Sequence, residues 1–186
     1  PPAPMNVPPS PAAFSWPGLR WLVLLLGLLA GCASLPDLSA RPPSFALAPR
    51  DDSPLGQIAR ASLSTPQASG FRLLASPPEA LRTRLELVGR ARHSIDLQVY
   101  QFKSDASGRR LLRAMRDAAA RGVRVRLLVD DLYNVGNDAL LSAFAEHEGV
   151  EVRYFNPFLY GRQGVMSRLA ASWFDFGRVQ RRMHNK

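Results

Sequence analysis

The stretch Gly122-Val123-Arg124-Val125-Arg126-Leu127-Leu128-Val129-Asp130-Asp131 decides the fold of this chain. Its residues from Val123 to Asp130 are rich in valine and leucine, which favours a β-strand. Gly122 precedes them, and glycine is the residue that best tolerates the left-handed backbone at a helix end. The stretch therefore predicts a helix that ends at Gly122 and a strand that follows at once.

The same alternation of helix and strand continues on both sides of this stretch. Strands are predicted at Ser94–Phe102 and Val150–Phe155, and helices at about 107–121 and from Asn137 or Asp138 to Gly149. Short turns between alternating strands and helices mean crossover connections and parallel strands. The expected fold class is α/β, with a mostly parallel sheet and helices on both of its faces.

Elements outside this central part are also predicted. Phe71–Leu74 reads as a short edge strand, and Ser76 with Pro77 as the start of a helix to about Ala91. Near the other end lies an amphipathic helix whose apolar face holds Met166, Leu169, Ala170, Trp173 and Phe174. Two interpretations of this helix stay open: packing on the sheet, or contact with lipid.

The N-terminal part is typical of an exported protein. Met5 is the expected start, and the apolar run 21–30 has the length of a signal peptide core rather than of a membrane span. Leu29-Ala30-Gly31-Cys32 resembles the lipobox of bacterial lipoproteins, in which the cysteine becomes the lipid-modified first residue. The alternative is a plain secretory signal with an incidental thiol.

Three parts of the chain follow from these patterns. Residues 1–31 are expected to be a signal peptide, 32–69 a lipidated N-terminus with a flexible proline-rich linker, and 70–186 the folded domain. Ala33 after the cysteine is typical of sorting to the outer membrane, on its periplasmic face. Since Cys32 is the only cysteine, the printed chain contains no intrachain disulfide.

The charge of the chain predicts anionic partners. Its 24 Lys and Arg residues exceed its 15 Asp and Glu residues, for a formal net charge of +9. Phospholipid headgroups and nucleic acid both fit such a surface, and charge alone does not separate them.

The last residues hold the candidate catalytic pair. On a strand, His184 and Lys186 point to the same face. The imidazole can attack phosphorus as a nucleophile, and the ammonium can stabilise the non-bridging oxygens. The plainer interpretation is a polar strand end.

Four stretches together carry a resemblance to a known family. They are 94–100, 122–131, 152–158 and 181–186, in this order. They look like the first half of a phospholipase D superfamily protein, most similar to the cardiolipin synthase-like branch. The resemblance covers about 71–186 and implies a two-lobed fold whose first lobe is this domain.

What the resemblance implies for the site is specific. The family motif is His-x-Lys, four residues and Asp, then a Gly-Ser pair and an Asn, in two copies that share one site. His184 and Lys186 match the first His and Lys, and the remainder of the motif would follow Lys186. By resemblance one His forms a phosphohistidine, its partner protonates the leaving alcohol, and no metal or other cofactor is needed. We expect the chain on its own to be inactive.

Other residues of the chain, and its function, have alternative interpretations. Asp130 and Asp131 at a strand end suit Mg²⁺, or alternatively a turn in which one carboxylate pairs with an arginine. His93 and His147 are interpreted as surface or turn residues. A nuclease or other phosphodiesterase of the same superfamily is the alternative enzyme, although a lipid anchor favours phospholipid over nucleic acid. A non-catalytic membrane-anchored binding lipoprotein is the third possibility.

Overall fold

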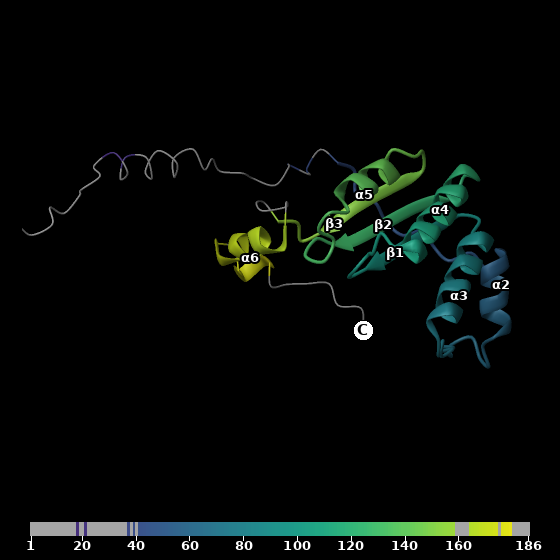
Figure 1. Ribbon diagram of the computed structural model, residues 1–186. Coiled ribbons are helices and arrows are strands. Elements are labelled where there is room, and N and C mark those ends of the chain that lie inside the picture. Colours follow the sequence, from purple (N-terminus) through teal and green to yellow (C-terminus); the bar gives the residue numbers. More distant parts are fainter. Residues whose placement is uncertain are drawn as a thin grey trace, which may run out of the picture. The chain divides into compact units, whose positions relative to one another are not determined.

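A computed structural model describes residues 18, 21, 37, 39, 41–158, 164–174 and 176–179. The chain divides into two compact units, residues 1–34 and 35–186. All elements discussed below belong to the second unit (Figure 1). None of the helices among the described residues is both long enough and apolar enough to cross a membrane.

A parallel sheet of three strands forms the centre of this unit. The strands are β1 (Ser94–Val99), β2 (Arg124–Asp130) and β3 (Val150–Phe155), in the order β1-β2-β3. Leu97 is in register with Leu127, and Leu127 with Val152. Because the strands are parallel, their carboxyl ends lie at one edge of the sheet. The α/β fold predicted from the sequence is confirmed.

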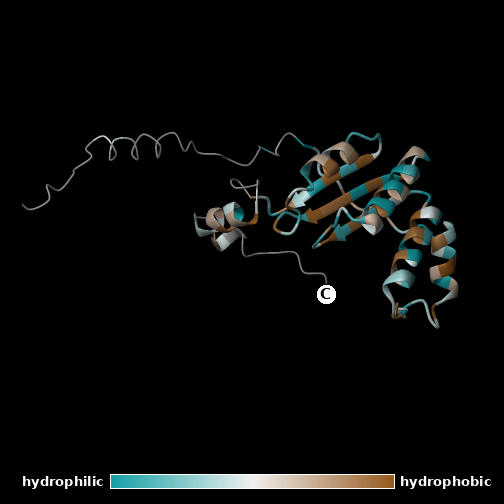
Figure 2. Ribbon diagram, in the orientation of Figure 1, coloured by the Kyte–Doolittle hydropathy of each residue, from teal (hydrophilic) through white to brown (hydrophobic). Residues whose placement is uncertain are grey.

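One face of the sheet carries the hydrophobic core. Helices α4 (Ala106–Ala120) and α5 (Asp138–Ala145) pack on this side, and α3 (Pro77–Arg90) packs against α4 (Figure 1). Figure 2 shows hydrophobic residues concentrated in the central strands and mixed with hydrophilic ones on the helices. The buried apolar residues are Val88, Ala91, Phe102, Leu112, Met115, Ala118, Ala119, Val123, Val125, Leu127, Val129, Leu141 and Phe144.

The other face of the sheet is polar. Alternate strand residues such as Asp96, Arg126 and Arg153 project from it. The extended segment 44–46 lies over it instead of a helix. The sequence predicted helices on both faces of the sheet. Helices α3, α4 and α5 all contribute to the core on the first face, so none of them covers the second.

Local signals account for the helix ends. The Ser76 hydroxyl accepts the N–H of Glu79 at 3.4 Å, and the Asp105 carboxylate accepts the N–H of Gly108 at 2.9 Å. These side chains satisfy backbone donors that the first helical turn leaves open. Gly122 has a φ of 87°, the left-handed geometry predicted for it. Asn137 precedes α5 but makes no side-chain cap; its side-chain nitrogen donates to the carbonyl of Phe102.

The segment expected to be a linker contains ordered structure. Helix α2 (Pro54–Ala61) starts after Ser53, whose hydroxyl accepts the N–H of Gly56 at 3.0 Å. Prolines at N-terminal helix positions are compatible with helix formation, since their missing N–H has no helical partner there. A proline-rich composition therefore did not by itself mean an extended chain.

The predicted edge strand at 71–74 is wrong. These residues form no strand, and Phe71 and Leu73 are 95% and 87% exposed. The hydrophobic content of 71–74 favoured a strand, but a strand forms only where it can pair with a neighbouring strand. The described strands β1, β2 and β3 pair only with each other.

Two helices follow β3. They are α6 (Val165–Phe174) and the short α7 (Phe176–Val179). Helix α6 lies where the amphipathic helix was predicted.

Candidate active-site edge of the sheet

Two asparagines join the loops that leave β1 and β2 at the carboxyl edge of the sheet. The side-chain oxygen of Asn134 accepts the N–H of Phe102 at 3.1 Å. The amide of Asn137 donates to the carbonyl of Phe102 at 2.7 Å. Asn134 is fully buried and Asn137 nearly so. The two buried side chains thus bind both the N–H and the carbonyl of Phe102, and such satisfied buried hydrogen bonds fix this residue in place.

A buried ion pair joins β2 to α6 at the same edge. The guanidinium of Arg168 donates to Oδ1 of Asp131 at 2.8 Å, and both side chains are 0% exposed. The other oxygen, Oδ2, accepts the N–H of Phe158 at 2.8 Å. Arg168 also lies 5.7 Å from the centre of the Phe158 ring, within cation–π range. The turn after β2, the segment after β3 and helix α6 therefore meet at one carboxylate.

Helix α6 turns its apolar side away from this contact. Met166, Leu169 and Trp173 are 77%, 52% and 86% exposed, whereas Arg168 is fully buried. The interpretation that the apolar face packs on the sheet is therefore wrong among the described residues. The physical reason is the buried carboxylate of Asp131, which requires a cation in contact and so turns the arginine side of the helix inward.

The predicted catalytic and lipidation residues lie outside the described residues. This applies to His184, Lys186 and Cys32. In the sequence the catalytic pair comes after α7, which ends at Val179. Their roles stay predictions.

The aspartates at the end of β2 follow the turn-and-pairing interpretation. Oδ1 of Asp130 accepts the N–H of Leu132 at 2.8 Å, as in a turn, and Asp131 pairs with Arg168. In the part of the chain that the structure describes, no three His, Cys, Asp or Glu side chains are grouped as metal ligands would be. The residues present at this edge thus fit a structural role better than a Mg²⁺ site.

His93 and His147 are both exposed, as predicted. Neither belongs to the Asn134 or Asp131 contacts described above. They are outside the candidate active-site edge.

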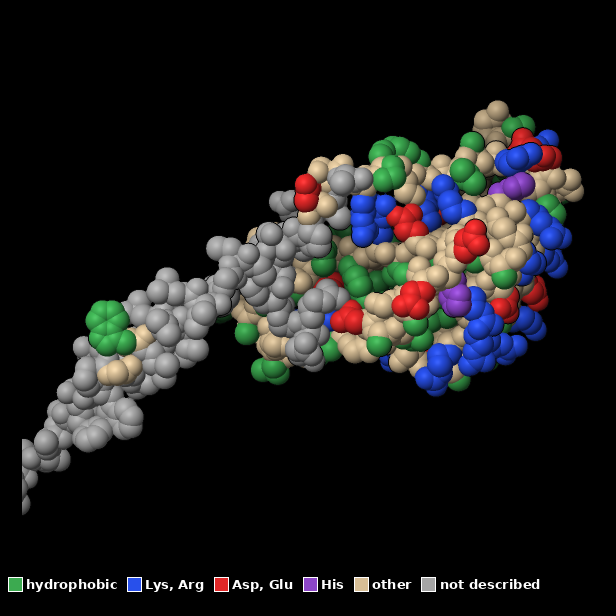
Figure 3. Space-filling view, turned by 90° about the horizontal axis from the view of Figure 1, so that it is seen from above, with side chains coloured by type: hydrophobic (Ala, Val, Ile, Leu, Met, Phe, Trp, Pro, Cys, Tyr) green, Lys and Arg blue, Asp and Glu red, His purple; other side chains and the backbone are tan. Residues whose placement is uncertain are grey.

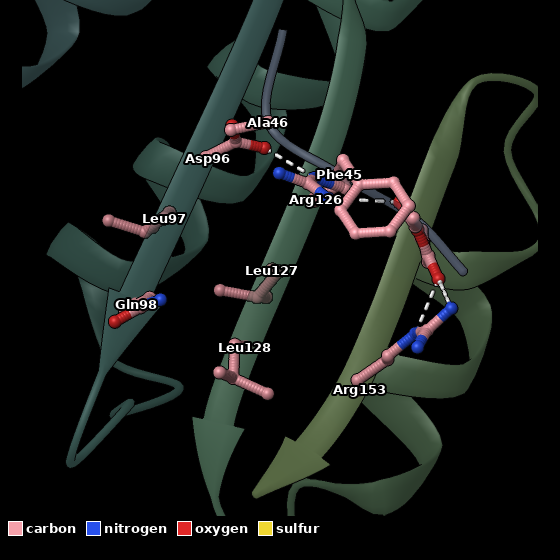
Figure 4. Close-up of a pocket in the computed structure, with 11 residues that line it drawn as sticks. Phe45, Ala46, Asp96, Leu97, Gln98, Arg126, Leu127, Leu128 and Arg153 are labelled. Atoms are coloured by element: carbon pink, nitrogen blue, oxygen red, sulfur yellow. Dashed lines mark hydrogen bonds and ion pairs between the residues drawn. The ribbon is translucent and has the colours of Figure 1, made fainter. Parts of the chain in front are cut away.

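A pocket of about 360 Å³ lies on the polar face of the sheet (Figure 4). Its charged side chains are satisfied by one another. Arg126 donates to Asp96 at 2.5 Å and to the Ser44 hydroxyl at 2.9 Å, and Arg153 pairs with Glu151. Figure 4 shows Arg126 turned toward Asp96, with segment 45–46 beside them.

The electrostatics of this pocket stabilise the charged forms already present. The hydrogen bond from Arg126 lowers the pKa of Asp96, and Asp96 in turn raises the pKa of Arg126. The described residues of the lining include no His or Cys, the side chains that most readily act as nucleophile or general base. We interpret the pocket as a place where the N-terminal segment is held on the sheet, not as the reaction site.

Comparison with known proteins decides the family. The family model "Cardiolipin synthase, PLD-like domain" matches residues 85–186. The chain belongs to this family. The resemblance to the phospholipase D superfamily, and to its cardiolipin synthase-like branch, is thereby confirmed.

Individual relatives agree with this assignment. The chain is 40% identical over 121 residues to cardiolipin synthase C of Escherichia coli, covering 65% of this chain and 25% of that protein. It is 35% and 37% identical to uncharacterized proteins from two strains of Helicobacter pylori, over 136 and 123 residues. These matches cover 72% and 65% of this chain and 26% and 24% of those proteins. The aligned part thus spans about a quarter of each of these relatives.

Sequence reasoning missed the residues that organise the edge. The sequence analysis assigned no specific role to Arg168 or Asn134, although it allowed one carboxylate at the end of β2 to pair with an arginine. An arginine in an otherwise uncharged helix is a usable signal when a strand elsewhere ends in two carboxylates. The partner of Asn134, a backbone group 32 residues earlier, is decided by the crossover geometry and leaves no local trace.

Proposed function

We propose that the protein containing this chain performs phospholipase D-type phosphodiester chemistry on membrane phospholipids, as a phosphatidyltransferase that makes cardiolipin. The observation that carries the proposal is the family match over 85–186. This range contains His184 and Lys186, which match the family's His and Lys by resemblance of sequence. The similarity to a relative named cardiolipin synthase C supports the choice of product.

In the proposed mechanism His184 is the nucleophile. Its imidazole nitrogen forms a bond to phosphorus while the bond from phosphorus to the leaving alcohol oxygen breaks. The second motif of the complete site gives a proton to that oxygen. Lys186 holds the non-bridging oxygens, where negative charge must be stabilised. An acceptor alcohol then loses a proton to the same partner group and attacks phosphorus, which releases the histidine; water in that place gives hydrolysis.

The described edge would support this chemistry by positioning. The Asp131–Arg168 pair holds α6 at the carboxyl ends of the strands, and α7 and His184 follow α6 in the chain. Open α/β sheets bind ligands beyond the carboxyl ends of their strands. This placement supports a reaction site at the same edge.

The test uses the full-length protein with phosphatidylglycerol vesicles. Cardiolipin and released glycerol are measured for wild type, His184→Ala and the control His93→Ala, which changes an exposed histidine. We expect His184→Ala to lose at least about 100-fold in rate and His93→Ala to keep wild-type activity. Phosphatidylglycerol turnover that survives His184→Ala would contradict the mechanism.

The basic surface also fits a nuclease of the same superfamily. The same preparations incubated with DNA separate the two enzymes. Cleavage of DNA without turnover of phosphatidylglycerol would make the nuclease the better assignment. The absence of both activities would favour a non-catalytic binding lipoprotein.

We also propose a lipid anchor at Cys32, which would hold the protein at the outer membrane on its periplasmic face. Mass spectrometry of the mature N-terminus tests it. A Cys32→Ser variant should lose the acyl mass and leave the membrane fraction. An unmodified thiol in the wild type would contradict the anchor.

A further inference from the structure

A groove outside the candidate active-site edge lies between helices α4 and α5. Its volume is about 200 Å³. Figure 3 shows basic side chains gathered along one border of the molecule. The groove is lined by Arg109, Leu112, Arg113, Arg116, Leu140, Ala143, Phe144 and His147.

The three arginines form one row on α4. Positions 109, 113 and 116 are spaced by four and three residues, so they share one side of the helix, and all three are exposed. Arg116 pairs with Asp117 at 2.8 Å. Arg109 and Arg113 form no ion pair with the residues that the structure describes. Like charges four residues apart on a helix repel one another, so an anionic ligand between them is favoured.

The floor of the groove is apolar. Leu112 and Phe144 are each 5% exposed, and Leu140 packs on the same core. A row of guanidinium groups above an apolar floor matches a ligand with an anionic head and a hydrocarbon part.

We propose that the α4–α5 groove binds the phosphodiester headgroup of an anionic phospholipid, and so holds the domain on the bilayer. The guanidinium groups of Arg109 and Arg113 bind the phosphate oxygens, and the first carbons of the lipid lie against Leu140 and Ala143. The site shares no residue with the candidate active-site edge. The inference rests on the proposed function in one respect, namely that the protein acts at a membrane surface.

Nucleic acid fits this groove less well. Single strands are bound by several aromatic side chains on which bases stack. Among the described lining residues Phe144 is buried, which leaves the ring of His147. The space of about 200 Å³ suits one headgroup rather than a strand.

The first experiment measures binding to phosphatidylcholine vesicles with and without phosphatidylglycerol. It uses the full-length protein in a Cys32→Ser background, so that no acyl chain contributes. The triple variant Arg109→Gln, Arg113→Gln, Arg116→Gln is compared with Arg82→Gln, Arg84→Gln, Arg90→Gln on α3. Both remove three exposed charges. We expect the groove variant to lose about 10-fold or more in affinity for the anionic vesicles relative to the α3 variant.

A second pair adds a charge instead of removing one. Ala143→Glu places a carboxylate in the groove, whereas Ser142→Glu places it on an exposed α5 position that does not line the groove. We expect only Ala143→Glu to weaken vesicle binding. Circular dichroism confirms that each variant is folded.

Several outcomes would overturn the proposal. These are equal loss in the groove and α3 variants, no preference of the wild type for anionic vesicles, or loss of oligonucleotide binding without loss of vesicle binding. A His184→Ala protein should bind vesicles as wild type does. If wild type lacks turnover while the groove variants still lose binding, the proposed function fails and this inference stands.

Discussion

Helices α4 and α6 are both amphipathic, but they present opposite sides to the protein. In α4 the apolar residues Met115 and Ala118 are 0% exposed and its arginines face outward. In α6 the arginine Arg168 is 0% exposed, and Met166 and Trp173 are 77% and 86% exposed. The same pattern type thus has opposite orientations in one chain.

The difference lies in what each helix contacts. Helix α4 packs over the valine and leucine side chains of β2, so burial of its apolar side is favoured. Helix α6 meets the carboxylate of Asp131 at a strand end, and an unpaired buried carboxylate costs several kcal/mol. An amphipathic pattern therefore shows that two sides differ, while the partner decides which side is buried.

The largest effect is expected when the buried ion pair is broken. Arg168→Met should destabilise the protein by about 3–5 kcal/mol, because Asp131 is left as a buried charge. Urea unfolding of the full-length protein measures this, with Arg109→Met as an exposed arginine control. The double variant Arg168→Met, Asp131→Asn should recover much of the loss, because its neutral amide oxygen can still accept the N–H of Phe158. A loss below about 1 kcal/mol in the single variant would mean that the pair does not hold α6.

The next test makes the same chemical change on each helix. Met115→Ala should cost about 2–5 kcal/mol, because it opens a cavity in the core. Met166→Ala should change stability by less than about 0.5 kcal/mol, because that side chain is exposed. Thermal unfolding of both variants checks the pair. A similar loss in both would show that the apolar side of α6 is covered in the complete protein.

A smaller effect is expected at the asparagine contacts of the candidate active-site edge. Asn134→Ala should destabilise by about 1–3 kcal/mol, because the N–H of Phe102 loses its partner in a buried place. Gln98→Ala, on the exposed part of β1, is the control and should be nearly neutral. Hydrogen exchange at the amide of Phe102 measures the contact directly. Unchanged protection of that amide would contradict the assigned bond.

The smallest effect concerns pH. Arg126 lowers the pKa of Asp96, so the folded protein holds this proton less tightly than the unfolded chain does. The resulting stabilisation is present above about pH 4 and is lost as the pH falls through the lowered pKa. Asp96→Asn should therefore be less stable than wild type at neutral pH, and the gap should narrow in acid. Unfolding at about pH 7 and about pH 3 checks the sign; a gap that widens in acid would contradict it.

The central fold was predictable because its signals are local. The helix start at Ser76 and the turn at Gly122 each depend on neighbours a few residues away. The prediction of a strand at 71–74 was wrong because a strand needs a neighbouring strand to pair with, and hydrophobic content does not specify that partner. The roles of His184 and Lys186 came from motif resemblance, and the described geometry neither adds to them nor removes them.

The sequence by itself determined the order of strands and helices, the caps that begin and end them, and the family to which the chain belongs. These follow from backbone preferences and from motif residues that lie close together in the chain. The tertiary structure alone decided that Arg168 meets Asp131, that Asn134 holds Phe102, and that α6 turns its apolar side outward. The two contacts join residues more than 30 positions apart, and the orientation of α6 follows from the charge pair with Asp131. Only the folded arrangement of the strands brings these partners within reach.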